Sequence, residues 1–276
     1  MRQARPRPST WSARPPSLTR PRRPGVRGLF VTATDTGVGK TVLSAALSAA
    51  LIEAGESVRA HKPVVTGLDE QPPGAAICGS RSSASDGDAR VAERQTWPAD
   101  HELLGAITGA APDEVAPQRY RAAAAPHLAA QLAGERIDAD ELLAAAADAE
   151  ARASGAAQTL IVEGVGGLLT PLAERFTVRD LARSLGLPLL VAARPGLGTI
   201  NHTLLTLQAA RASGLVVRAV VLTPWPAQAG ALELSNRDTI TRLGDVEVAL
   251  LRHIAGPDPG ALARAGAGLP WRRWLE

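Results

Sequence analysis

The sequence predicts one doubly wound α/β domain, in which helices cover both faces of a mostly parallel sheet. From residue 28 onward, short continuous apolar runs alternate with Ala- and Leu-rich stretches of helical length. Such alternation is typical of parallel strands that are buried on both faces. A glycine-containing loop joins the first apolar run to the first helical stretch. Because ligands of such sheets bind beyond the carboxyl ends of the strands, function is expected in the loops that follow them.

Each predicted element follows from its local pattern. Apolar runs predict strands at residues 28–33, 58–62, 159–163, 187–192, 216–222 and, as the weakest, 246–251. Helical patterns fall at residues 41–54, 138–153, 178–185, 199–213 and 232–243. Gly55 closes the first helix, as glycine commonly does. Residues 68–100 are polar and irregular, and because they follow a strand end they are expected to contribute to the site.

The first 27 residues predict a disordered, dispensable arm, and residues 28–276 a single domain. The arm holds eight arginines and no acid, so the rest of the chain carries about 3 − 8 = −5 charges. An arm of this composition has little apolar surface to bury. Arg22 and Arg23 lack the apolar core of an export signal, so the arm is an appendage or precedes a true start near Val26. The mildly acidic domain argues against a nucleic-acid partner.

The remaining composition indicates a cytoplasmic protein without a structural metal. Cys78 is the only cysteine, which excludes an internal disulfide and a cysteine metal cluster. The five histidines show no metal-type spacing. No apolar run reaches the ~18 residues of a membrane span, so no membrane partner is expected.

The loop TATDTGVGKT, residues 32–41, predicts a phosphate site of the P-loop NTPase type. Its backbone N–H groups lie at the start of a helix, where N–H groups and the helix dipole favour an anion. Lys40 is expected to reach the β- and γ-phosphates, and the hydroxyl of Thr41 is expected to bind Mg²⁺. Thr34 stands where the common G-x-x-x-x-G-K-[ST] pattern has its first glycine.

Two further charges follow predicted strands. Glu163 ends an apolar run and precedes a glycine turn, so its carboxylate is expected to hold Mg²⁺ beside the phosphates. Lys62 ends another strand, and Pro63 fixes the chain as it turns. A second cation at this edge suits an anionic substrate that is about to receive phosphate.

Four ordered motifs, TATDTGVGKT, HKPVVTG, VEGVGG and LGTINHTLLTLQAA, together resemble the dethiobiotin synthetase family. In that family the loop has one residue more than the common pattern, and its first glycine corresponds to Ala33. The resemblance implies an ATP-dependent cyclo-ligase. Its reaction joins 7,8-diaminononanoate and CO₂ into dethiobiotin through a carbamate and a carbamic-phosphoric anhydride, and it releases ADP and phosphate. The resemblance also implies a homodimer.

The resemblance further implies roles for individual residues. Lys40 stabilises the transferring phosphoryl group and Lys62 holds the carbamate. The implied Mg²⁺ ligands are Thr41, Glu163 and an aspartate of the long loop, for which Asp88 matches better than Asp86. Nucleotide contacts are implied for Gly37, Val38, Gly39, Lys40, Thr41, Val42, Asp88, Glu163, Gly164, Val165, Gly166, Thr223 and Pro224. Substrate contacts are implied for Thr36, Lys62 and Thr66, and for Gly198, Thr199, Ile200 and Asn201 of the other subunit.

One departure from the family pattern bears on the nucleotide base. Thr223 and Pro224 stand where the better-known pattern has Asn-Asp, whose amide can read adenine. Threonine offers a single hydroxyl and proline has no N–H. We therefore expect that nucleoside triphosphates other than ATP are also accepted, unless Trp225 or a residue beyond Val246 supplies the contact.

Two alternatives share this fold. A ParA/MinD-like ATPase switch carries a signature lysine five residues before the loop lysine, and here that position is Asp35. An ATP-dependent amidoligase of corrinoid synthesis needs a glutaminase domain with a nucleophilic cysteine, for which too few residues follow Leu222.

Overall fold

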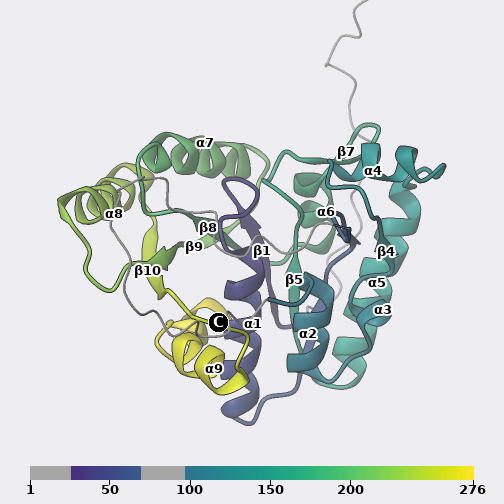
Figure 1. Ribbon diagram of the computed structural model, residues 1–276, viewed down its shortest axis with the longest axis horizontal. Coiled ribbons are helices and arrows are strands. Elements are labelled where there is room, and N and C mark those ends of the chain that lie inside the picture. Colours follow the sequence, from purple (N-terminus) through teal and green to yellow (C-terminus); the bar gives the residue numbers. More distant parts are fainter. Residues whose placement is uncertain (1–25, 70–96) are drawn as a thin grey trace, which may run out of the picture.

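The structure, a computed structural model, describes residues 26–69 and 97–276 and is built on a six-stranded sheet (Figure 1). Neighbouring strands all run parallel. In spatial order the strands are β10 (Glu247–Arg252), β9 (Val217–Trp225), β8 (Leu189–Ala193), β1 (Gly28–Ala33), β5 (Thr159–Glu163) and β2 (Val58–His61). The predicted doubly wound, P-loop NTPase-like α/β class is confirmed.

The strand order places the candidate site. β1 lies between β8 and β5, and the chain passes from β1 beyond β5 to β2, then from β5 across β1 to β8. Connections therefore leave the centre of the sheet in opposite directions. At such a switch point the loops separate and leave a crevice at the carboxyl ends of the strands.

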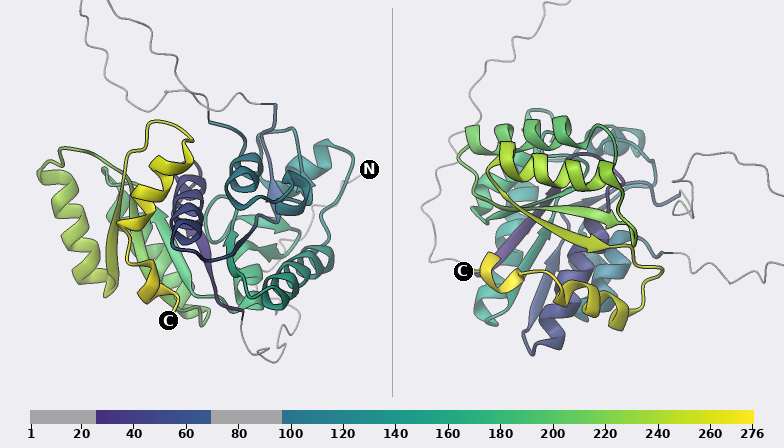
Figure 2. Two further views of the ribbon diagram at one scale, coloured as in Figure 1. Left: turned by 90° about the horizontal axis from the view of Figure 1, so that it is seen from below. Right: turned by 90° about the vertical axis from the view of Figure 1, so that its left-hand side faces the viewer.

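The sheet has a separate apolar core on each face. Leu29 and Val31 of β1 pack into one core, whereas Phe30 between them packs into the other, as the period of two in a strand requires. The helices on the first face are α1 (Lys40–Glu53), α2 (Asp100–Thr108), α9 (Pro259–Ala267) and α10 (Trp271–Trp274). Those on the second are α5 (Ala139–Gly155), α6 (Val178–Leu185), α7 (Thr199–Ala212) and α8 (Ala231–Gly244). Figure 2 shows α7 and α8 opposite α1 and α9 across the sheet.

Short elements complete the described chain. They are β3 (Val64–Val65), α3 (Pro112–Val115), β4 (Gln118–Arg119), α4 (Pro126–Leu132), β6 (Pro171–Ala173) and β7 (Phe176–Thr177). The backbone N–H of Lys62 donates to the carbonyl of Val115, 2.8 Å away. This bond ties the end of β2 to α3 and thereby sets the position of Lys62.

The predicted strands and helices agree with the structure to within a few residues. β9 runs three residues beyond its predicted end and includes Thr223 and Pro224. Helix α9 was not predicted, and it packs so closely on α1 that a Cβ atom at Gly266 would lie 2.0 Å from the carbonyl oxygen of Ala46. The predicted arm, Cys78, Asp86 and Asp88 lie outside the described residues. Within residues 26–69 and 97–276, no helix is long and apolar enough to cross a membrane.

Candidate active site

The loop between β1 and α1 presents free backbone N–H groups. Gly39 is the N-cap of α1, and no side chain caps the helix, so its first N–H groups remain available to an anion. Gly37 and Gly39 have φ angles of 68° and 99°, which favour glycine. A Cβ atom at Gly39 would also lie 3.2 Å from two side-chain atoms of Thr223. The structure therefore places the end of β9 against the predicted phosphate loop.

Four side chains from four segments meet beside this loop. The hydroxyl of Thr41 donates to Oε1 of Glu163 at 2.8 Å. Lys62 Nζ lies 2.6 Å from the same Glu163 oxygen and also forms an ion pair with Asp100. The Glu163 side chain is fully buried, whereas that of Asp100 is 41% exposed. The cluster is thus open to a ligand on the side of Asp100.

The charges of this cluster shift one another's pKa values. Burial lowers the pKa of Lys62, but the charges of Asp100 and Glu163 and their hydrogen bonds outweigh it and raise that pKa above the ordinary lysine value. Burial followed by repulsion from Lys62 lowers the pKa of Lys40 to about 8. Burial raises the pKa of Asp100, yet the charge of Lys62 and hydrogen bonds from Lys62 and Thr41 bring it below the ordinary value. The two carboxylates therefore favour the charged form of Lys62.

Lys40 is held close to the loop. Its ammonium donates to the carbonyl of Asp35 at 3.2 Å, and the residue is 7% exposed. Asp35 in turn accepts a bond of 2.7 Å from the backbone N–H of Thr36. The ammonium of Lys40 is thus held at the beginning of the loop, five residues before its own position in the chain.

The donor atoms fit a hard cation. Glu163 Oε2 is buried and has no hydrogen-bond partner in the described part of the chain. Thr41, which donates to Oε1 of Glu163, and Asp100 add two more oxygen donors to the cluster. Residues 26–69 and 97–276 hold no group of three or more His, Cys, Asp or Glu that could bind a metal unaided. Two carboxylates and a hydroxyl suit Mg²⁺, which is usually completed by phosphate oxygens and water.

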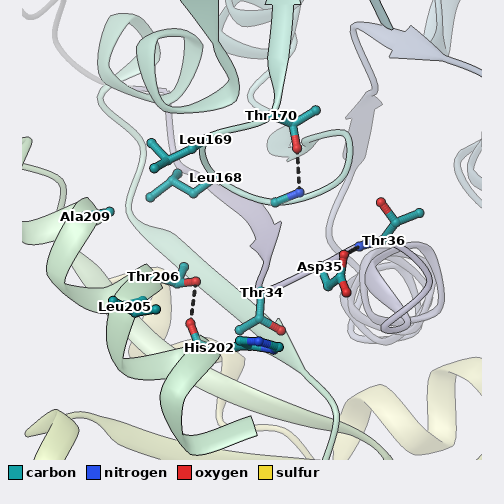
Figure 3. Close-up of a pocket in the computed structure, with 11 residues that line it drawn as sticks. Thr34, Asp35, Thr36, Leu168, Leu169, Thr170, His202, Leu205, Thr206 and Ala209 are labelled. Carbon is teal, nitrogen blue, oxygen red and sulfur yellow. Dashed lines mark hydrogen bonds between the residues drawn. The ribbon is translucent and has the colours of Figure 1, made fainter. Parts of the chain in front are cut away.

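A cavity of about 390 Å³ adjoins the first half of the loop (Figure 3). Its lining comes from three segments, the loop after β1, the turn after β5 and one side of α7. In Figure 3, His202 and Thr206 of α7 face the loop residues Thr34, Asp35 and Thr36, and Thr170 lies on the third side. The lining mixes hydroxyls with the apolar side chains of Leu168, Leu169 and Leu205, which suits a ligand with a polar head and an apolar chain.

The glycines after Glu163 have packing explanations. A Cβ atom at Gly164 would lie 2.8 Å from Val178 Cγ1, and one at Gly166 would lie 2.5 Å from Thr170 Oγ1. Gly166 also has a φ of 60°. These glycines therefore let the turn pack tightly, and they carry no direct sign of nucleotide contact.

The predicted substrate residues fall in two places. Thr36 lines the cavity, and Thr66 is half-buried just after β3. Gly198, Thr199, Ile200 and Asn201 lie at the start of α7, outside the cavity lining, which begins one residue later at His202. Gly198 is the N-cap of α7 and no side chain caps it. Within a single chain the structure therefore does not bring these four residues to the cavity.

Asp100 is the main site residue that sequence reasoning missed. It is the last residue of the irregular segment predicted at 68–100, but in the structure Asp100 begins α2 and its carboxylate pairs with Lys62. An aspartate before a periodic apolar stretch, Asp100 to Ile107, is a signal for a helix start, and it was the only sequence signal available. Arg194, which follows β8, was also missed, and its Nη2 atom contacts the loop carbonyls of Thr36 and Gly37.

His61 is a buried base next to this cluster, and it predicts acid sensitivity of the fold. It is 2% exposed, and its Nε2 atom has no hydrogen-bond partner within the described ranges. Burial, with a smaller repulsion from Arg59, lowers its pKa to about 4, against about 6.5 in an unfolded chain. The neutral form is therefore favoured by folding. Its stabilisation is complete above about pH 6.5 and is lost as the pH falls toward 4.

We therefore expect the free energy of unfolding to fall by about 2 kcal/mol between pH 7 and pH 5 through His61 alone. Urea unfolding of the wild type and of His61→Leu at both pH values measures this contribution. The variant should lose about 2 kcal/mol less than the wild type, and the exposed His127→Leu serves as the matched control. Equal losses in the wild type and His61→Leu would contradict this assignment.

Comparisons with known proteins agree on one family. A family model described as an AAA domain matches residues 27–251. An ATP-dependent dethiobiotin synthetase from Mycobacterium sp. (strain KMS) is 39% identical over 252 residues, covering 90% of this chain and 97% of that protein. One from Anaeromyxobacter sp. (strain Fw109-5) is 40% identical over 198 residues, covering 71% and 76%. One from Bacillus subtilis subsp. natto is 31% identical over 223 residues, covering 81% and 85%.

Proposed function

Because the chain belongs to the ATP-dependent dethiobiotin synthetase family, we propose that it converts 7,8-diaminononanoate, CO₂ and ATP into dethiobiotin, ADP and phosphate. The observation that carries this proposal is the meeting of Lys62, Glu163, Thr41 and Asp100 beside the loop of Lys40. A carbamate and a triphosphate are both anionic, and cations with oriented N–H groups are what their reaction requires. No nucleophile from the protein is needed.

Different residues of the chain act on the diamine, the carbamate and the phosphoryl group. The diamine lies in the cavity beside Thr36, where one amine takes up CO₂ as a carbamate. Lys62 holds that carbamate, because its ammonium follows β2 and its charged form is favoured by Asp100 and Glu163. Lys40 and the N–H groups of the loop stabilise the γ-phosphoryl group as it moves to the carbamate oxygen. The second amine then attacks the mixed anhydride, and phosphate leaves.

Mg²⁺ completes the proposed site. Its proposed ligands are Thr41, Glu163 and Asp100, the residues whose oxygen atoms converge beside the loop. Asp100 takes the place of Asp88 in this proposal because it lies in the cluster, while Asp88 is outside the described residues. When bound, Mg²⁺ neutralises charge on the β- and γ-phosphates.

A homodimer of cytoplasmic chains is part of the proposal. Leu169 and Leu205 line the cavity and are 52% and 55% exposed. Leu197, which directly precedes Gly198 in the sequence, is 92% exposed. A second copy over these leucines would cover the apolar rim. It would also bring its own free N–H groups at Gly198–Asn201 toward the carboxylate of the substrate.

The two alternative functions, a ParA/MinD-like ATPase switch and an amidoligase of corrinoid synthesis, are not favoured. The relatives named dethiobiotin synthetase cover up to 90% of this chain. Asp35 occupies the position of the ATPase-switch lysine, and its carbonyl accepts from Lys40. The reaction itself tests the proposal. Purified protein with diaminononanoate, ¹³C-bicarbonate, ATP and Mg²⁺ should yield dethiobiotin one mass unit heavier than the unlabelled product, and absence of that product would overturn it.

Weak base selectivity is a second expected property. Thr223 is buried against Gly39 and Pro224 is exposed, so the end of β9 lies near the nucleotide yet offers no amide. We expect kcat/KM for CTP, GTP and UTP within about tenfold of ATP, because tenfold corresponds to about 1.4 kcal/mol. The measurement compares the four nucleotides at constant diamine, bicarbonate and Mg²⁺. Thr223→Asn should move selectivity toward ATP, and a wild-type ATP preference above about a hundredfold would contradict the assignment.

A further inference from the structure

Arg194 approaches the phosphate loop from the neighbouring strand. β8 pairs with β1 so that Ala192 lies beside Ala33, and the N–H of Thr34 donates to the carbonyl of Ala192 at 3.0 Å. Arg194 follows two residues later, at the same edge of the sheet as the loop. Its Nη2 atom lies 3.4 Å from the carbonyl oxygen of Thr36 and 3.3 Å from that of Gly37.

Most N–H donors of the Arg194 guanidinium have no acceptor among the described residues. A guanidinium carries five N–H donors, and among the described residues only Nη2 makes contacts, both long for a hydrogen bond. No ion pair joins Arg194 to an Asp or Glu within residues 26–69 and 97–276, and its side chain is exposed. An arginine without an acidic partner beside an anion site is available to the anion.

The backbone that carries Arg194 is itself held. Asn236 of α8 is 5% exposed, and its Nδ2 atom donates to the carbonyls of Pro195 at 2.8 Å and Gly196 at 3.1 Å. These bonds fix the chain immediately after Arg194. The side chain can therefore change partners while its Cα atom stays in place.

The contact of Arg194 with the loop also indicates which phosphate of a bound nucleotide it would meet. Thr36 lines the cavity, whereas Lys40 and Thr41 begin α1 at the other end of the loop. Arg194 contacts the carbonyl of Thr36, so it stands on the side of the loop that faces the acceptor substrate. In the proposed reaction the group that passes to the acceptor is the γ-phosphate, so a cation on this side of the loop is placed to meet the γ-phosphate.

We propose that Arg194 is a catalytic arginine, which leaves the loop carbonyls to bind the γ-phosphoryl group during transfer; this inference rests on the proposed function. In that step the carbamate oxygen forms a bond to the γ-phosphorus. The bond from the γ-phosphorus to the β,γ-bridging oxygen breaks, and ADP leaves with that electron pair. Negative charge spreads over the γ-phosphoryl oxygens in such a transfer, and an arginine supplied in cis stabilises it.

The test compares Arg194→Met with Arg194→Lys and with the control Arg237→Met, which removes a half-buried arginine of α8 paired with Asp238. We expect Arg194→Met to lower kcat at least about thirtyfold and to weaken binding of the β,γ-imido analogue of ATP at least about tenfold, while the Kd for ADP changes less than threefold. Added guanidinium ion should restore part of the lost kcat. Arg237→Met should leave all three values unchanged.

Equal weakening of ADP and the ATP analogue would overturn the proposal, because it would mean that Arg194 only braces the loop. A fall in kcat below threefold would overturn it as well. If Arg194→Met fails to fold, Arg194→Lys provides the same comparison, since it keeps one charge but loses the planar fork. Nucleotide binding needs no diamine, so absence of dethiobiotin with the wild type would count against the proposed reaction and leave the binding comparison intact.

Discussion

Replacement of Lys40 by alanine is expected to lower kcat for dethiobiotin formation by about 100- to 1,000-fold. The reason is that its ammonium is held against the loop by the carbonyl of Asp35, and one preorganised donor to developing charge is worth about that factor. KM for the diamine should change less than kcat, because Lys40 acts on the phosphoryl group. Steady-state kinetics with varied diamine and varied ATP measure the separation.

The fold should tolerate the loss of Lys40, because its side chain bonds only to the carbonyl of Asp35 among the described residues. Thermal unfolding of the variant checks this point. A Lys40→Ala protein with wild-type kcat, or one whose only change is a higher diamine KM, would contradict the assignment.

Replacement of Lys62 by methionine is expected to lower both stability and activity. Lys62 lies at a strand end, where a lysine is ordinarily solvated, yet it is 3% exposed and neutralises the fully buried Glu163. Removal of one partner from a buried ion pair costs about 3–5 kcal/mol, because the other charge is left unpaired. Urea unfolding of Lys62→Met should show a loss of this size.

The double variant Lys62→Met, Glu163→Gln supplies the control for that prediction. Since the glutamine is neutral, the double variant should regain most of the lost stability while it stays inactive. A Lys62→Met protein as stable as the wild type would contradict the buried pair. Unchanged kcat and diamine KM would contradict its role with the carbamate.

Much of the fold could be predicted because it depends on local patterns. The strands β1 and β5 are short apolar runs, and the loop before α1 carries its glycines where left-handed φ angles occur. Helix α9 was not found in this way, since it is only nine residues long and its sequence, PGALARAGA, consists mostly of Ala and Gly. Its position depends on the close contact of Gly266 with α1, which only the folded chain supplies.

Some residues of the candidate site could likewise be predicted from local patterns, and others could not. Lys40, Thr41 and Glu163 follow strands or open a helix, so the sequence places them. Asp100 lies 38 residues from Lys62 along the chain, and no local pattern links the two. Its contact arises because α2 packs on α1 and β2. Arg194 is likewise an ordinary charge after a strand until the pairing of β8 with β1 sets it beside the loop.

Transfer of phosphate to a carbamate is the central claim, and oxygen labelling tests it most directly. Purified protein is supplied with diaminononanoate, ATP, Mg²⁺ and freshly dissolved C¹⁸O₂ in unlabelled water. After a single turnover, mass spectrometry measures the ¹⁸O content of each product. The account predicts one ¹⁸O in the released phosphate and one in the ring carbonyl of dethiobiotin, because the carbamate oxygen that attacks the γ-phosphorus leaves with it. Dethiobiotin formed together with unlabelled phosphate would contradict the account.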